Sequence, residues 1–207
     1  SATTRRWRRV IRLRGLSRFC MTFAAVTAPT ESSWPLEGKN EASGAFEQTV
    51  RDVNGDLAFV SSGRFLALKP DHFRWDIEAP DAQVLIATPN GFWQWDKDLD
   101  VVILRDAPDF AHLPISSIWS GAMSLKPDDN TINAHFGGDI KALAVHSTDA
   151  GAIVVLFEDA LGQETQFVFT LDSEPLVPAS SFELTVPSDA DFYNESSRRT
   201  GLSGVLK

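Results

Sequence analysis

The sequence is poor in the residues that support redox, metal and hydrolytic chemistry. It has one cysteine, Cys20, and four histidines in 207 residues. A single cysteine excludes a disulfide within the chain, a C-x-x-C redox pair and a thiolate metal cluster. The histidines lack the spacing of metal ligands, and no serine lies in a nucleophile elbow. We therefore expect no enzymatic activity, no cofactor and no resident metal.

Basic residues are scarce after the first 18 positions. The chain has 19 Lys and Arg against 28 Asp and Glu, and seven arginines lie within residues 5–18. Residues 19–207 therefore hold 12 basic and 28 acidic residues, a formal net charge of −16. Such a body is repelled by the phosphates of nucleic acids and by anionic membrane surfaces. We expect no nucleic-acid partner.

Long apolar runs are also missing, apart from a short one near the start. A basic stretch is followed by the apolar run 19–26, and Val26 and Ala28 are spaced like a cleavage site. This pattern indicates a secretory signal, with a basic amphipathic helix as the alternative. Residues rich in Pro, Gly, Ser and charge then indicate a linker. The predicted division is 1–28 signal or basic segment, 29–44 linker, 45–195 folded domain and 196–207 flexible tail.

What the sequence does contain is a series of alternating segments. In 68–80, "LKPDHFRWDIEAP", Phe73, Trp75 and Ile77 fall on one face of a strand and charged residues on the other. Asn54-Gly55 between two apolar runs is typical of a hairpin, and the other connections are also short, which favours antiparallel pairing. The expected strands are 46–52, 56–62, 63–69, 73–79, 83–88, 92–96, 99–105, 131–136, 141–147, 152–158, 165–171 and 182–187.

One segment, 106–125, breaks the alternation and spaces its apolar residues in a helical manner, with Pro114 able to begin a helix. The fold class is therefore α+β, a curved antiparallel sheet with a short helical insertion. The apolar face of such a sheet is larger than the insertion can cover. On the residues alone, a closed barrel with a packed interior and a partly open barrel that holds apolar cargo remain equal alternatives.

Two acidic motifs carry weaker enzyme or metal interpretations. Asp76 and Glu78 lie two residues apart on the outer face of a predicted strand, whereas a glycosidase needs its carboxylates in a cleft. The stretch 96–100 resembles the start of a calcium loop, but Val101 stands where that loop needs glycine. Both motifs are better explained as solvated surface.

Several motifs follow one another in a specific order between Phe46 and Phe192. The most specific part is the Lys69-Pro70 turn followed by Phe73-x-Trp75 and by P-x-x-Q at 80–83. The other stretches are "FEQTVRDVNG", "NGFWQWDKDLDVVI", "EDALGQETQFVF" and "FELTVPSDADF". In this order the motifs resemble those of the LolA-type outer-membrane lipoprotein carriers.

The resemblance implies a strongly curved antiparallel sheet forming a half-open β-barrel with a short helical lid. It also implies a monomeric periplasmic carrier that holds the acyl chains of lipoproteins. Such a carrier would be loaded by an inner-membrane ABC transporter of the LolCDE type and unloaded at an outer-membrane acceptor. A LolA-like shuttle for another acylated product, a polyene or a glycolipid, and a lipoprotein sensor of the same architecture are the alternatives.

The same resemblance assigns roles to individual residues. Phe73 matches a transporter contact and Trp75 the cavity wall, and Ile115 and Ile118 match apolar lid positions. Lys69 stands where the family has an arginine that latches the lid, and lysine lacks the planar fork of donors. Strand phase adds further lipid-binding candidates, which are Leu66, Leu68, Phe167 and Phe169.

Two departures from the family concern size. The amphipathic helix that usually precedes the F-x-Q strand is missing from 29–44, so either the lid is smaller or the predicted signal is that helix. Residues 126–145 are short for the strands expected there, which indicates a narrower barrel or a different cargo.

Overall fold

A computed structural model describes residues 34–126, 132, 136 and 138–197 of the chain. By its internal contacts the chain divides into Ser1–Ser32 and Ser33–Lys207. The predicted signal, 1–28, and most of the predicted tail, 196–207, lie outside the described residues. The second unit contains every element described below.

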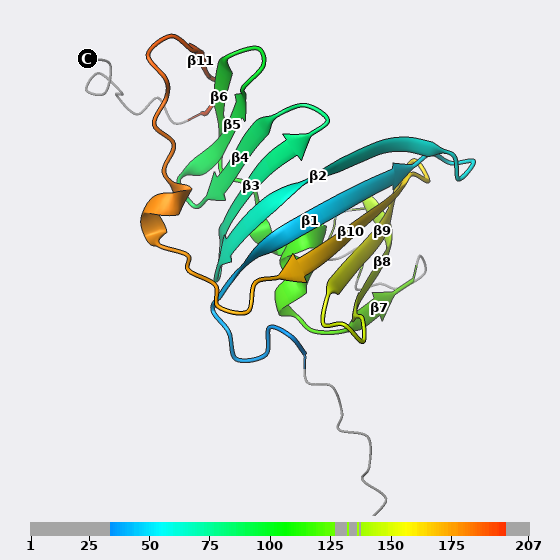
Figure 1. Cartoon of the computed structure of the whole chain (residues 1–207). Coiled ribbons are helices and arrows are strands. Elements are labelled where there is room, and N and C mark those ends of the chain that lie inside the picture. Colours follow the sequence, from blue (N-terminus) through cyan, green and yellow to red (C-terminus); the bar gives the residue numbers. More distant parts are fainter. Residues whose placement is uncertain (1–33, 127–131, 133–135, 137, 198–207) are drawn as a thin grey trace, which may run out of the picture. The chain divides into compact units, whose positions relative to one another are not determined.

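The architecture is one 11-stranded sheet in the order β11-β6-β5-β4-β3-β2-β1-β10-β9-β8-β7 (Figure 1). All neighbouring strands are antiparallel except β11 and β6, which are parallel. The sheet is not closed, because β11 and β7 lie at its two ends. The strands are β1 Glu41–Arg51, β2 Leu57–Leu68, β3 His72–Ala79, β4 Gln83–Thr88, β5 Gly91–Asp96, β6 Val101–Arg105, β7 Met123–Leu125, β8 Ile140–Ser147, β9 Ile153–Asp159, β10 Glu164–Leu171 and β11 Asp191–Asn194.

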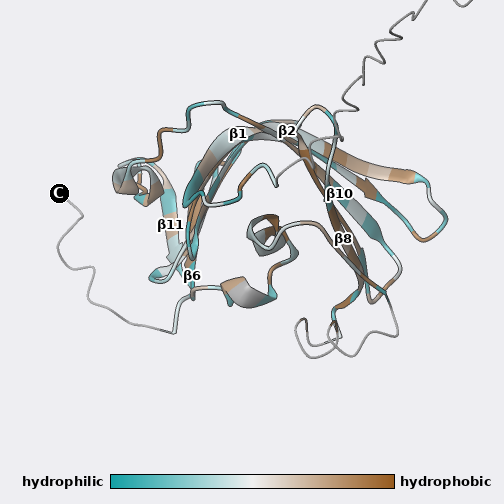
Figure 2. Ribbon diagram, turned by 90° about the horizontal axis from the view of Figure 1, so that it is seen from below, coloured by the Kyte–Doolittle hydropathy of each residue, from teal (hydrophilic) through white to brown (hydrophobic). Residues whose placement is uncertain are grey.

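Short 3₁₀ helices flank the sheet. The helices η1 Phe110–His112 and η2 Pro114–Trp119 lie on its concave side, where the sheet curves around them (Figure 2). Pro114 occupies the first turn of η2, as predicted, but the insertion is 3₁₀ rather than α-helical. A third helix, η3 Ala179–Phe182, packs on the opposite side against β3 and β4.

Two glycines let the central strands approach closely. A Cβ on Gly44 would lie 2.0 Å from the carbonyl oxygen of Thr170, and a Cβ on Gly63 would lie 2.0 Å from that of Asp76. Side chains at these positions would push β1 from β10 and β2 from β3. The sequence prediction ended one strand at residue 62 and began another at Gly63, but β2 continues through this point with a shift of register against β3.

The predicted hairpin at Asn54-Gly55 is confirmed. It joins β1 to β2, and Gly55 adopts φ of +82°. The backbone N–H groups of Asn54 and Asp56 donate to the Asp52 carboxylate at 2.9 and 3.0 Å. These hydrogen bonds lower the pKa of Asp52, because they favour its charged form.

Two predicted strands are wrong. In 131–136 the described residues Ile132 and Phe136 are helical, and both are buried at a spacing of four that suits one helix face. In 182–187 no strand forms, and Phe182 ends η3. The strand β11, which was not predicted, is short and pairs with a segment about 90 residues away.

The predicted linker, 29–44, needs a correction at its end. β1 already begins at Glu41, and Leu36 is only 2% exposed within the core. Composition indicated a linker, but Ala42 and Gly44 pair with β2, and Gly44 is small because β10 approaches it closely at Thr170. The boundaries of the other predicted segments stay predictions.

Candidate functional site

A cavity of about 460 Å³ opens on the concave face of the sheet. Ten of its thirteen lining residues are apolar, and they come from five strands and the segment around η1 and η2. The apolar lining is Phe46, Trp75, Ile77, Leu85, Ala87, Phe92, Pro108, Leu113, Ile115 and Phe167. The polar lining is Gln48, Arg105 and Asp106.

The strand register explains why these side chains meet. Trp75 lies opposite Leu85, and Ala87 lies opposite Phe92, so three successive strands place apolar residues on the same face. Alternation along β3 places Arg74 and Asp76 on the other face, away from Trp75 and Ile77. The cavity therefore follows from the period-two pattern of the sequence together with the pairing order.

The segment of η1 and η2 rests on an aromatic row. The ring of Phe73 stacks on Trp75 at 5.3 Å and on Phe110 of η1 at 6.2 Å between centroids. Ile118 of η2 is 1% exposed, and its carbonyl accepts a hydrogen bond of 2.9 Å from Trp34 Nε1. The segment is thus attached to the concave side by packing and by one long-range hydrogen bond.

The structure brings only some of the predicted lipid-binding residues to the cavity. Trp75, Ile115 and Phe167 line it. Ile118 and Phe169 are each 1% exposed and belong to the packed core of the concave side instead.

The placement of Leu66 and Leu68 at the cavity is wrong. Leu66 lies opposite Arg74, and both leucines pack against the second hydrophobic cluster on the outer face. That cluster consists of Val84, Ile86, Val177 and Phe182. In "FLAL" every residue is apolar, so alternation cannot fix the phase there, and pairing of Phe65 with Trp75 decides it.

Phe73 and Lys69 lie close to the 3₁₀ segment. Phe73 is 1% exposed beneath Phe110, so in this conformation its ring does not reach a partner protein. The Lys69 ammonium lies 4.9 Å from the centroid of the Trp119 ring in η2, a cation–π distance. Lys69 thus contacts the segment it was predicted to hold, through an aromatic face.

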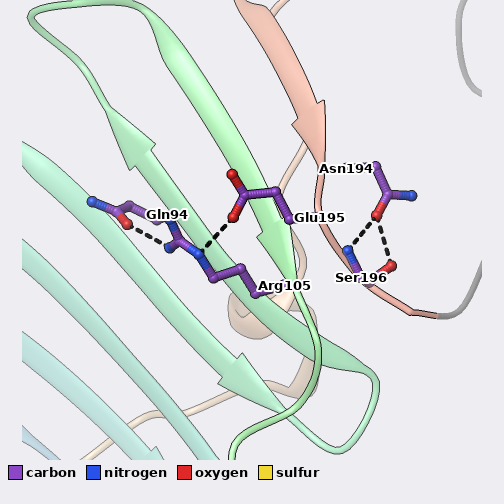
Figure 3. Close-up of polar contacts among 5 residues, drawn as sticks. All are labelled: Gln94, Arg105, Asn194, Glu195 and Ser196. Carbon is purple, nitrogen blue, oxygen red and sulfur yellow. Dashed lines mark hydrogen bonds and ion pairs between the residues drawn. The ribbon is translucent and has the colours of Figure 1, made fainter.

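The polar residues that border the cavity were not identified from the sequence. Arg105 Nε donates to Glu195 at 2.9 Å, and another guanidinium nitrogen donates to Gln94 Oε1 at 2.9 Å (Figure 3). Asp106 accepts hydrogen bonds of 3.0 Å from the backbone N–H and the hydroxyl of Ser197. Glu195 and Ser197 follow β11, whose pairing with β6 no local pattern revealed.

Other candidate chemistry has a structural explanation. Asp96 accepts hydrogen bonds from the backbone of Asp98 and Leu99, so this stretch is a tight turn. Within the described ranges, no three or more His, Cys, Asp or Glu residues gather as metal ligands would. None of the helices in that part of the chain has the length and apolarity needed to span a bilayer.

An unclosed, mostly antiparallel sheet with an apolar cavity on its concave face has the geometry of a binding protein for apolar molecules. Comparison with known protein families shows to which family this chain belongs. The family model "Outer membrane lipoprotein carrier protein LolA" matches residues 37–150, more than half of the chain. The chain belongs to the LolA family.

Relatives agree with this assignment. An outer-membrane lipoprotein carrier protein of Xanthomonas axonopodis pv. citri is 37% identical over 170 residues, 74% of this chain and 81% of the relative. Proteins of the same name from Dechloromonas aromatica and Alkalilimnicola ehrlichii are 28% and 25% identical, cover 72% and 76% of this chain and are covered to 79% each.

Proposed function

We propose that this chain is a lipoprotein carrier that holds acyl chains in the cavity of its concave face. The observation that carries the proposal is the apolar cavity of about 460 Å³ in a member of the LolA family. Trp75, Ile115 and Phe167 would contact the acyl chain directly. Ile118 and Phe169 would support this lining from behind.

The cavity volume sets the amount of cargo. At about 30 Å³ for each water-sized group, 460 Å³ takes up about 15 groups of methylene size. At about 0.8 kcal/mol per methylene, burial of such a chain contributes about 12 kcal/mol before the cost of association. Because association costs about 4–15 kcal/mol, the net affinity remains reversible, as a carrier requires.

The sheet and the 3₁₀ segment together form the half-open barrel and the lid of this proposal. The segment η1–η2 would act as the lid, and the contact of Lys69 with Trp119 would be its latch. Contact of Phe73 with a transporter would require Phe110 to move off its ring first.

The proposed route is periplasmic. An ABC transporter of the LolCDE type would load the monomeric carrier at the inner membrane, and an outer-membrane acceptor would unload it. A free acyl chain exposes methylenes to water at about 0.8 kcal/mol each, so it does not cross an aqueous compartment alone. The cavity removes this cost without a cofactor or a nucleotide.

The experiment is purification of the full chain from cells, followed by mass spectrometry of bound acylated molecules. Delipidated protein should then bind a fluorescent fatty-acid probe, and Trp75→Glu should abolish binding by placing a charge in the apolar lining. Val60→Glu is the control, because Val60 is 48% exposed and lies outside the cavity. A folded Trp75→Glu variant that binds the probe like the wild type contradicts the proposal.

A second candidate is a shuttle for another acylated product, a glycolipid or a polyene. The cavity favours it in one respect, because room for about 15 methylene-sized groups suits a product with one acyl chain, whereas a triacylated lipoprotein has three. Mass spectrometry of the copurified material separates the candidates. Transfer of bound cargo to acceptor membranes separates both from a sensor, which would bind lipid and retain it.

A further inference from the structure

A row of hydrogen-bonded polar side chains borders the apolar cavity. We call it the polar row, and it consists of Gln83 of β4, Gln94 of β5, Arg105 of β6 and Glu195 after β11. Gln94 donates to Gln83 at 3.5 Å, and Arg105 donates to Gln94 and to Glu195 at 2.9 Å each. The arginine with its two stronger bonds is drawn in Figure 3.

The polar row faces the same side as the cavity. Gln83 lies opposite Ile77, Gln94 opposite Leu85, and Arg105 opposite Phe92. Each of these apolar partners lines the cavity, and residues directly opposite in a ladder share a face. Arg105 itself belongs to the cavity lining. A molecule inside the cavity therefore meets apolar walls and, at one side, a guanidinium.

Arg105 has donors to spare. A guanidinium carries five N–H groups, and the hydrogen bonds to Glu195 and Gln94 within the described residues use two of them. These two bonds also hold the fork in a fixed orientation, which reduces the entropy lost when a ligand binds to it.

The charges around Arg105 favour a neutral acceptor over an anion. Arg105 contributes one positive charge, and its partner Glu195 and its lining neighbour Asp106 contribute one negative charge each, so the group sums to −1. A carboxylate or phosphate would be repelled by this group. A carbonyl oxygen needs only a donor and carries no net charge.

We propose that Arg105 binds the ester or amide carbonyl at the polar head of an acylated cargo, with the hydrocarbon chain in the adjoining cavity. This proposal rests on the proposed acyl-carrier function and adds an orientation to it. The head group lies at the β6 side of the cavity, and the chain extends toward Phe46 and Phe167. Arg105 then discriminates acyl carbonyl compounds from plain hydrocarbon chains.

The test uses delipidated full chain and three ligands with the same 14-carbon chain. They are methyl tetradecanoate, the matching methyl alkyl ether without a carbonyl, and tetradecanoate. Each displaces a fluorescent fatty-acid probe from wild type, Arg105→Leu and Arg64→Leu. Arg64 is the matched control, because it also pairs with a carboxylate, Asp172, but does not line the cavity.

We expect wild type and Arg64→Leu to bind the ester about tenfold more tightly than the ether. Arg105→Leu should lose this preference and keep its affinity for the ether. Should Arg105→Leu fail to fold, Arg105→Met replaces it, because methionine keeps a long side chain but has no N–H group to donate, and the same loss is expected.

An ester preference that survives substitution of Arg105 overturns the proposal, as does a wild-type preference for the carboxylate over the ester. In either case, binding of the ether would still support an apolar cavity that holds acyl chains. Failure of all three ligands to bind the wild type overturns the carrier function itself.

Discussion

The volume of the cavity predicts how affinity depends on acyl chain length. Each methylene that enters the cavity adds about 0.8 kcal/mol, which is about a fourfold gain in affinity. The gain should stop near 15 carbons, because 460 Å³ takes up about 15 methylene-sized groups. A plot of log affinity against chain length should therefore rise steeply and then flatten.

A substitution that fills the cavity should move this break. Ala87 lines the cavity and is 4% exposed, and Ala87→Phe adds six ring carbons. These carbons occupy the room of about six methylenes, so the break should shift from about 15 to about nine carbons. Overpacking should also cost about 1–3 kcal/mol of unfolding free energy.

Isothermal titration calorimetry or probe displacement with fatty acyl ligands of 8 to 18 carbons measures the break. Val60→Phe is the control, since it adds a ring at an exposed position outside the cavity and should leave the break in place. If affinity keeps rising to 18 carbons in Ala87→Phe, with the fold intact, the acyl chain lies somewhere other than this cavity.

Three further predictions concern neighbouring features. Leu66→Ala should lower the free energy of unfolding by about 1–2 kcal/mol, because Leu66 is half-buried on the outer face. The substitution should leave the affinity for the fluorescent probe unchanged. A reduced affinity would mean that Leu66 lines the cavity. In a double-mutant cycle on urea unfolding, Lys69→Met and Trp119→Leu should show a coupling free energy of about 0.5–1 kcal/mol. A coupling of zero would mean that the cation–π contact contributes nothing to stability. NMR titration should give Asp52 a pKa below its ordinary value of 3.8. Because the pKa of Asp52 is lower in the folded state than in the unfolded state, its charged form stabilises the fold fully above pH 3.8. This stabilisation is lost as the pH falls through the lowered pKa. The stability of Asp52→Asn should not show this contribution to the pH dependence.

Local patterns predicted the strands that alternate clearly. The expected strand 83–88 coincides with β4, and the expected strand 73–79 differs from β3 by one residue. The turn at Asn54-Gly55 was equally visible, because Gly55 takes a positive φ that few other residues adopt. In these places, nearest neighbours in the chain determine the structure.

Features that depend on distant pairing were not predictable. The phase of Leu66 follows from the register between β2 and β3, and the sequence around it is apolar on both faces. The polar edge needs Glu195 to reach Arg105 across 90 positions of the chain, through the parallel pairing of β11 with β6. Neither relation has a local signature, so Trp75 was recognisable as a site residue and Arg105 was not.

The two ends of the sheet, β11 and β7, are terminal in the strand order and so do not form a ladder with each other. Because no ladder joins these ends, splaying them would require only a small change of twist at each of the ten strand pairings, without breaking an interstrand hydrogen bond. A sealed barrel would have to rupture a ladder for the same expansion. A guest that exceeds the volume of the cavity would therefore meet a bending cost shared along the strands, and this cost opposes the gain from each further methylene.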